Sequence, residues 1–305
     1  MNTKTTRILI LLLVYFICSH SFVRAQGLSE KGGFGKIGSP VITVPDKKDS
    51  LSSWTNTLSG KLNLSQAGFS NWRSGGENSL TWVSILDGKF IYQSPKIDFR
   101  TQSIFSYGQT KQGSSTFRKN NDLIDISSVV SYLLGFTVDP YFSVTARTQF
   151  DYGYQYIGDS AVEISNFFDP GYVTQNIGFQ YLYGTVFDVR IGFSLKETFS
   201  RKFTNFTDDP KTEKIEKVKV QPGAELVSNF NRKFDDNFSL KSKLELFTDF
   251  KGISTVDIRW DTYVSYRLLK YIEVSFNFVM YYNFNESKQF QWKEILGIGL
   301  AYDFM

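Results

Sequence analysis

The stretch FSNWRSGG carries the side chains best suited to ligand binding in this sequence. Trp72 presents a broad aromatic surface, Arg73 is a permanent cation, and Gly75 and Gly76 would let a bound molecule approach the backbone closely. The same residues also fit a folded corner, in which Asn71 bonds backbone groups, Trp72 packs under the loop and the glycines adopt positive φ. We expect the corner, with Trp72 as a latch rather than a gate.

Catalysis and phosphate binding at this stretch are disfavoured by what accompanies it. The Gly75-Gly76 pair opens no helix and is followed by no Lys-Ser or Lys-Thr dipeptide, which a phosphate-binding loop needs. The only histidine of the chain is His20 and the only cysteine is Cys18. Imidazole is the commonest general base and a common metal ligand, so its position near the start of the chain matters.

Residues 1–25 have the pattern of a cleaved secretory signal peptide. Lys4 and Arg7 precede an apolar run at 8–17, and Ala25 supplies the small residue that signal peptidase reads. The run is too short to remain as a transmembrane helix. Because cleavage after Ala25 would remove the histidine and the cysteine, we expect no enzyme, no cofactor and no metal site in the mature protein.

The acidic residues of the loops do not suggest an acid–base pair either. Asp208-Asp209 and Asp235-Asp236 are sequence neighbours, an arrangement more typical of solvated turns than of two carboxylates facing each other across a cleft. The loop at 202–217 is acidic but lacks the spacing of an EF-hand calcium site.

The charge and composition predict an exported β-barrel. Removing Lys4, Arg7 and Arg24 with the signal peptide, and no acid, changes the formal net charge from +4 to 4 − 3 = +1. A nearly neutral chain gives no electrostatic reason to bind nucleic acid. Aromatic residues make up 17% of the chain while its mean hydropathy is only −0.22. This combination excludes a helical membrane protein and is typical of an outer-membrane β-barrel.

Apolar and polar residues alternate with a period of two from Trp54 onward. At 142–156 the even positions are mostly apolar or aromatic, whereas the odd positions are polar and include Arg147 and Asp151. Such alternation indicates strands with one lipid-facing and one water-facing side. We therefore expect an all-β fold, a transmembrane antiparallel up-and-down β-barrel of about 12 strands. The expected strands are 54–66, 78–93, 96–110, 122–136, 141–156, 172–183, 186–201, 217–231, 237–250, 256–268, 271–283 and 291–304.

Connections of two lengths alternate between these strands. Barrels of this kind have short periplasmic turns and longer outer loops, so both ends of the chain should lie in the periplasm. We expect residues 26–53 to form a flexible periplasmic leader and residues 54–305 to form the barrel. The longer loops are expected at 67–77, 111–121, 157–171 and 202–216.

Two places conflict with this pattern. Pro222 falls inside an expected strand and cannot donate to a ladder, so a bulge or an end of pairing is expected there. The strand at 78–93 is apolar on both faces, with Val83 and Ile91 on one side and Leu86 and Phe90 on the other. We expect loop one or the leader to cover its inner face.

The water-facing positions carry charges of both signs. They could line a pore, or they could pair across strands and fill a narrow interior; we favour pairing. The exchange between Lys241-x-Lys243 and Asp257-x-Arg259-x-Asp261 is where we expect a cross-strand ladder. The lumen-lining candidates are Arg100, Arg147, Asp151, Arg190, Lys241, Asp257, Arg259, Asp261 and Arg267.

The element Asn71-Trp72-x-x-Gly75-Gly76-Glu77-Asn78 resembles a Bacteroidota family of exported, aromatic-rich proteins described as a domain of unknown function. The resemblance implies an outer-membrane location and names no activity. It provides no catalytic residue to carry over.

The function that we expect is a narrow outer-membrane channel or facilitator for small solutes. The alternative is a structural or accessory barrel that binds an envelope partner through its loops or leader without transport. The expected surroundings are outer-membrane lipid and lipopolysaccharide, with the barrel-assembly machinery acting during biogenesis. We expect a monomer that does not bind nucleic acid.

Overall fold

The computed structural model describes residues 52–70, 77–157, 160–184, 186–209, 211–251, 256–283 and 287–304. The expected signal peptide, nearly all of the expected leader, and Asn71, Trp72, Arg73, Gly75 and Gly76 lie outside these ranges. No helix in the described ranges is long and apolar enough to cross a membrane.

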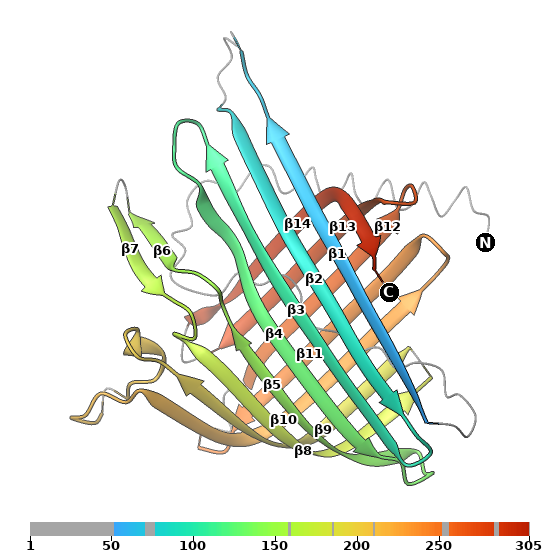
Figure 1. Cartoon of the computed structure of the whole chain (residues 1–305). Helices are drawn as coiled ribbons and strands as arrows, with labels where there is room; N and C mark the ends of the chain where they lie inside the picture. Colours follow the sequence, from blue (N-terminus) through green and yellow to red (C-terminus); the bar gives the residue numbers. More distant parts are fainter. Residues whose placement is uncertain are drawn as a thin grey trace. The chain divides into compact units, whose positions relative to one another are not determined.

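Twelve strands close into one antiparallel barrel, which confirms the expected fold class and strand number (Figure 1). Consecutive barrel strands pair with each other, and the last strand returns to pair with the first. The barrel strands are β1 (Ser53–Ala67), β2 (Ser79–Gln93), β3 (Ile97–Gln112), β4 (Arg118–Tyr132), β5 (Val138–Thr148), β8 (Gly171–Tyr183), β9 (Phe187–Phe199), β10 (Val218–Lys233), β11 (Phe238–Asp249), β12 (Val256–Arg267), β13 (Ile272–Asn283) and β14 (Ser287–Asp303).

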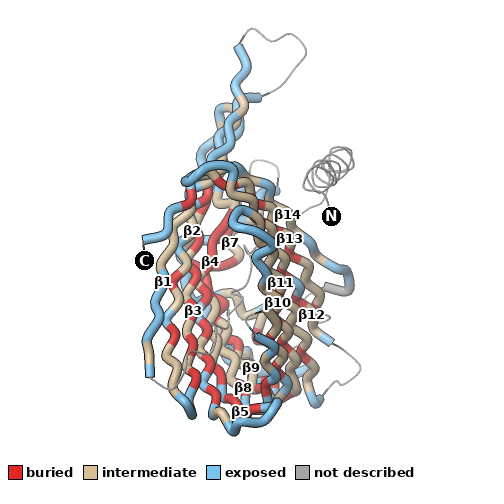
Figure 2. Tube along the Cα trace, turned by 90° about the vertical axis from the view of Figure 1, so that its right-hand side faces the viewer, coloured by how far each residue is buried: buried red, intermediate tan, exposed pale blue. Residues whose placement is uncertain are grey.

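The strands place polar side chains inside the barrel and apolar ones outside. In β9, Asp188 and Arg190 are 2% and 4% exposed, whereas Ile191 and Phe193 are 58% and 68% exposed. Successive side chains of a strand point to opposite faces, so this contrast separates a polar interior from an apolar exterior. Figure 2 shows the resulting alternation of buried and less buried positions along β3 and β4.

The expected alternation of short and long connections is confirmed only in part. The connections at 68–78, 149–170 and 200–217 are long, but 113–117 is no longer than 133–137, and 284–286 is as short as 94–96. The chain turns tightly between β2 and β3, β4 and β5, β8 and β9, β10 and β11, and β12 and β13. Because neighbouring strands are antiparallel, all of these turns lie at the end of the barrel where β1 begins. We call this the short-turn end and the opposite one the long-loop end. The long-loop end includes the 3₁₀ helix η1 (Thr204–Phe206).

The expected strand at 141–156 was wrong beyond Thr148. The chain leaves the barrel there, and β6 (Gly153–Ile157) pairs with β7 (Ser160–Ser165) in a separate two-stranded sheet. The Asp122 carboxylate accepts the backbone N–H groups of Phe150 at 2.7 Å and Asp151 at 2.9 Å, which removes these donors from the ladder. Because the apolar–polar alternation continues through this break, the sequence pattern hides it.

The fourth barrel strand begins earlier than expected. It starts at Arg118 rather than at residue 122, because Arg118 and Lys119 pair with Thr110 and Gln109 of β3. A register shift next to Gly108 accommodates the extra residue on β4. The polar run at the start of β4 resembles a loop in sequence, which explains the error.

Pro222 marks an end of pairing on one side only. Its register partner on β9 is Leu195, whereas pairing with β11 begins one residue later, at Gly223. The Pro222 carbonyl accepts the N–H of Phe250 at 3.0 Å, so its backbone polar side faces β11. A backbone N–H at position 222 would point toward β11, where the β10–β11 ladder ends, so a proline is tolerated there.

The apolar residues on the two faces of β2 lie in different environments. Val83 and Ile91 are buried inside, at 4% and 6% exposure, whereas Leu86 and Phe90 are exposed outside. Loop-one residues 71–76 and the leader, which we expected to cover the inner face, lie outside the described residues.

Candidate functional site

The barrel interior holds charged side chains that meet from opposite walls. Arg147 on β5 lies 2.6 Å from Asp125 on the neighbouring strand β4 and 3.7 Å from Glu245 on β11. Strands β8, β9 and β10 separate β5 from β11 in the barrel wall. The Arg147–Glu245 contact therefore crosses the interior.

The expected cross-strand ladder between β11 and β12 is present in part: the Arg259 guanidinium lies 4.0 Å from Glu245, whereas Asp257 lies opposite Phe247. Lys243 is the register partner of Asp261, and Glu245 is the register partner of Arg259. Glu245 also pairs with Lys243 on its own strand at 2.5 Å, and Arg259 pairs with Asp261 at 2.8 Å. Lys241, in contrast, lies opposite Tyr263 rather than opposite an acid.

A second cluster surrounds Arg100, which is only 1% exposed. Its guanidinium lies 3.3 Å from Asp98 on the same strand and 3.9 Å from Asp188 on β9, and it donates to Gln180 Oε1 at 3.1 Å. Strands β4, β5 and β8 lie between β3 and β9. Asp188 also pairs with Arg190 at 3.5 Å, so two arginines share this carboxylate.

Two further contacts extend the network toward each end of the barrel. Lys196 on β9 lies 3.0 Å from Asp257 on β12. Lys61 on β1 lies 2.5 Å from Glu273 on β13 and donates to the Tyr263 hydroxyl at 2.8 Å. Each contact skips at least one strand of the wall.

This network is stable only because its charges are paired. A buried ion loses several kcal/mol of hydration, and removing one partner of a buried pair typically costs about 3–5 kcal/mol. Side-chain atoms of Asp98, Asn176 and Asn229 nevertheless have no hydrogen-bond partner among the described residues. The buried side chains of the interior are mostly polar or charged, so the interior is a polar space rather than a packed apolar core.

The structure brings most of the lumen-lining candidates together in this network. Lys241 faces the interior from β11, and Arg267 lies at the short-turn end, where it pairs with Asp303 at 3.2 Å. The candidates that join the interior ion pairs are Arg100, Arg147, Arg190, Asp257, Arg259 and Asp261.

Asp151 lies elsewhere, in the corner where the chain leaves β5. Its carboxylate accepts the hydroxyl of Tyr107 at 2.9 Å, and its carbonyl accepts Lys119 Nζ at 2.7 Å. Tyr107 alternates with the buried interior residues of β3, so it occupies the outward face of that strand. This placement differs from the expected lumen-lining position, because β5 ends before Asp151.

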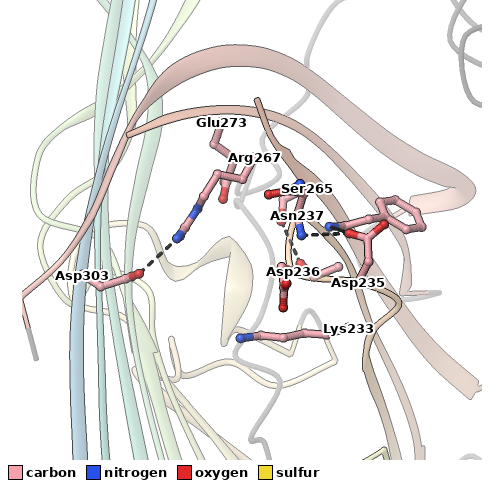
Figure 3. A pocket seen from close by; sticks show the side chains of 10 residues that line it. Lys233, Asp235, Asp236, Asn237, Ser265, Arg267, Glu273 and Asp303 are labelled. Carbon is pink, nitrogen blue, oxygen red and sulfur yellow. Dashed lines mark hydrogen bonds and ion pairs between the residues drawn. The ribbon is translucent and has the colours of Figure 1, made fainter. Parts of the chain in front are cut away.

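A shallow pocket of about 120 Å³ opens at the short-turn end (Figure 3). Arg267 reaches toward Asp303, while Asp235 folds back onto its own turn and accepts the N–H groups of Asn237 at 2.8 Å and Phe238 at 2.7 Å. Two cations, Lys233 and Arg267, face four acids, which gives a formal charge of 2 − 4 = −2. The acids of the lining are Asp235, Asp236, Glu273 and Asp303.

A buried carboxylate at the long-loop end ties two connections together. Asp169, in the connection between β7 and β8, accepts Ser200 Oγ at 2.5 Å and the backbone N–H groups of Lys202 at 2.8 Å and Arg201 at 3.0 Å. Burial alone would raise the pKa of Asp169, but these hydrogen bonds outweigh it and hold the pKa below its usual value. Asp169 therefore anchors the start of the loop that carries η1.

Sequence reasoning missed several members of the interior network, notably Asp125, Glu273 and Gln180. Asp125 is fully buried and holds Arg147, yet the expected β4 began too late for its alternation to stand out. The extra residue at the β3–β4 register shift changes the parity of the inward positions, so Asp125 falls into the inward set of Leu123 and Ser127 only once this shift is known. No group of three or more His, Cys, Asp or Glu residues in the described ranges is arranged to hold a metal ion.

The fold and interior define an inside-out, twelve-stranded antiparallel β-barrel. Residues 152–304, which are 153 of the 305 residues, match the family "Protein of unknown function, DUF481", and the chain belongs to this family. Residues 64–154 match a second family described as "Protein of unknown function (DUF3078)". The Bacteroidota origin implied by the loop-one resemblance stays a prediction.

No curated protein matches the chain. Among solved structures, the translocator domain of the autotransporter NalP from Neisseria meningitidis is similar at 10% identity and a TM-score of 0.37, covering 84% of this chain and 89% of that one. An outer-membrane channel from Pseudomonas putida F1 is similar at 13% identity and a TM-score of 0.37, covering 90% and 99%. The monoaromatic hydrocarbon channel CymD is similar at 9% identity and a TM-score of 0.32, covering 84% and 88%.

Proposed function

We propose that this protein is an outer-membrane barrel that acts as a narrow facilitator for small solutes, with ion pairs across its interior as the gate. An exterior of exposed apolar side chains around a polar interior supports the membrane location. Lipid and lipopolysaccharide would surround the barrel after its insertion by the assembly machinery. No residue is assigned a catalytic role.

The observation that carries the proposal is the difference between contacts within one wall and contacts across the interior. Arg147 lies 2.6 Å from Asp125 on its own wall but 3.7 Å from Glu245 across the interior. Arg100 shows the same difference: it lies 3.3 Å from Asp98 on its own strand and 3.9 Å from Asp188 across the interior. When the walls separate, each arginine keeps its nearer acid, so no ion is left without a partner.

This arrangement suits a gate better than a permanent plug. An apolar core would close a barrel at no cost in buried charge, whereas an interior of paired charges can hydrate and admit a polar solute. Arg147 and Glu245 are 15% and 16% exposed, so both already have access to water. The narrowness of the gate favours solutes of small size.

Conductance across a planar bilayer tests the proposal. Purified, refolded protein should give small, brief unitary currents, with heat-modifiable migration in detergent gels as evidence that the barrel is folded. A folded barrel that inserts into the bilayer and never conducts, even under applied voltage, would contradict the facilitator.

The filled interior also favours a second candidate, an accessory barrel without transport. In that case the ion pairs would be permanent, and the loop anchored by Asp169 or the leader would bind an envelope partner. Complete absence of conductance in the variants that open the gate would support this candidate over the first.

A further inference from the structure

Lys241 is an interior lysine whose neighbours on both adjoining strands are neutral. Its register partners are Asn231 on β10 and Tyr263 on β12. Lys243, the next inward residue of β11, is by contrast the register partner of Asp261. Within the described residues, the Lys241 ammonium takes part in no hydrogen bond and no ion pair. The ladder of paired charges between β11 and β12 therefore ends before Lys241.

Two more lysines reach the same part of the interior from the opposite wall. Lys61 on β1 and Lys89 on β2 also have neutral register partners on both sides: Ile85 and Ala301 for Lys61, Thr57 and Gln102 for Lys89.

These two lysines act on Lys241 across the interior. Lys61 Nζ donates to the hydroxyl of Tyr263, the register partner of Lys241, at 2.8 Å. The positive charges of Lys61 and Lys89 both repel that of Lys241. Strands β1, β14, β13 and β12 separate β2 from β11 in the wall, so the approach of Lys89 to Lys241 crosses the interior. We call Lys61, Lys89 and Lys241 the lysine cluster.

Two acids lie near the lysine cluster, and both have other partners as well. Glu273 Oε1 accepts Lys61 Nζ at 2.5 Å and the Tyr263 hydroxyl at 2.8 Å. Asp87, on the inner face of β2, accepts Gln102 Nε2 at 2.7 Å. Three lysines and two acids give a formal charge of 3 − 2 = +1 among the described residues that act on one another here. Like charges repel strongly away from bulk water, so this surplus favours a bound anion.

The acids of the pocket at the short-turn end do not supply the missing charge. Asp303 pairs with Arg267 at 3.2 Å, and Asp235 accepts the backbone N–H groups of its own turn. Asp236 is exposed to solvent, and Lys233 adds a further cation to the same pocket. The charge that would balance the lysine cluster is therefore best provided by a solute.

The groups that converge here suit an oxyanion. Each ammonium can donate up to three hydrogen bonds, and those to an anionic oxygen are short and strong. All three lysines are only partly buried, so water and a small anion can reach them. An anion with two negative charges can bridge the cations of opposite walls, which a single charge cannot do as well. Lysine and arginine side chains serve in this way in anion-selective pores.

We infer that the lysine cluster is a binding site for a small oxyanion with two negative charges, and that such anions are the solutes that the barrel admits. The inference deepens the proposed function and rests on it, because it names the class of polar solute. Lys241 carries the site, since Lys61 is also engaged by Glu273.

Calorimetric titration of the refolded protein tests the site. The probes are inorganic phosphate and succinate at slightly alkaline pH, where both are mainly dianions, with chloride at equal ionic strength as the reference. Two probes are needed because phosphate and carboxylate groups present the same anionic oxygens to lysine. Binding of either dianion, with none of chloride at the same ionic strength, is the expected result.

Three variants show whether the lysine cluster binds the anion. Lys241→Met should weaken binding at least about tenfold, the value of a hydrogen bond between charged groups, whereas Lys241→Arg should retain it. The matched control is Lys196→Met, which removes an interior lysine that has its own acid, Asp257, at 3.0 Å. This control should leave the affinity unchanged.

The Lys241→Met variant should fold normally, because it removes a charge that its neighbours repel. Heat-modifiable migration and urea unfolding check this. No binding of either dianion by the wild type, or equal binding by Lys241→Met, would overturn the site. An equal loss in Lys196→Met would also overturn it, since general interior charge rather than the lysine cluster would then hold the anion.

Conductance distinguishes this inference from the function on which it rests. If the dianion reduces chloride currents of the wild type but not those of Lys241→Met, both proposals stand. Currents without dianion binding would keep the facilitator and refute the site. Binding that depends on Lys241, in a barrel that never conducts, would keep the site but refute the facilitator and the admission of these anions.

Discussion

Arg147 and Glu245 approach to 3.7 Å although three strands of the barrel wall separate β5 from β11. This contact exists only because the barrel closes, since nothing in the spacing of 98 residues along the chain brings the two together. Each residue also has a nearer partner, Asp125 for Arg147 and Lys243 for Glu245. The contact can therefore break without exposing a bare charge to a low-dielectric surrounding.

Removing the guanidinium should open the gate. In Arg147→Ala the cross-interior contact is lost while Glu245 keeps Lys243 and Arg259. The fully buried Asp125 also loses its cation, which should lower the unfolding free energy by about 3–5 kcal/mol. If the contact contributes about 1–2 kcal/mol to closure, the open probability should rise about 5–30-fold. Single-channel recording measures this directly. The surface variant Lys202→Ala, which breaks the exposed pair with Glu163, should leave the open probability unchanged.

Reversing interior charge should change ion selectivity. Arg147→Glu and Arg259→Glu each turn a cation of the interior into an acid, so permeation should shift toward cations. The reversal potential in a salt gradient reports the shift. If selectivity stays as in the wild type while the currents persist, these residues do not lie on the conducting path.

The Lys61–Glu273 pair should stabilise the closure of the barrel, because it joins β1 to β13 across β14. The effects of removing its two charges should not be additive. Lys61→Met leaves the buried Glu273 carboxylate without its cation and should cost about 3–5 kcal/mol of unfolding free energy. The double variant Lys61→Met/Glu273→Gln removes both charges and should recover most of that loss. Urea unfolding in vesicles measures the cycle, and a double variant no more stable than Lys61→Met would show that the pair does not act as a unit.

Asp169 should make loop anchoring depend on pH. Its pKa is lowered in the folded protein, so its stabilisation is fully present above the unfolded pKa of about 3.9 and is lost as the pH falls through the lower, folded pKa. Asp169→Asn should therefore cost about 1.5–3 kcal/mol at neutral pH, and the difference from the wild type should shrink in acid. Unfolding free energies at several pH values test this.

The matched control for Asp169 is Asp236→Asn, in an exposed turn at the other end of the barrel. A surface substitution of this kind should stay within about 0.5 kcal/mol of the wild type at every pH. A loss for Asp169→Asn that persists unchanged in acid would show that packing, rather than the ionised carboxylate, holds the loop.

Local alternation was sufficient to predict the barrel from the sequence. Period-two patterns, turn residues and connection lengths are properties of neighbouring residues, so they placed the twelve strands and the short-turn end before any contact was known. The cross-strand exchange between Lys243 and Asp261 was likewise within reach, because consecutive strands of an antiparallel barrel are neighbours in its wall. The end of β5 was not, since the alternation continues through Phe150 and beyond.

Only the tertiary structure decided which residues meet across the interior and how the barrel closes. The partners of Arg147 and Arg100 depend on strand number, tilt and stagger, which are set by closure of the whole sheet rather than by any one strand. β1 and β14, which lie far apart in the sequence, pair through five residues each, from Ser59↔Asp303 to Asn63↔Gly299, and no local pattern could report the length of this pairing. The sequence by itself determined an inside-out barrel with charges on its inner face; the tertiary structure decided which of those charges pair across the interior.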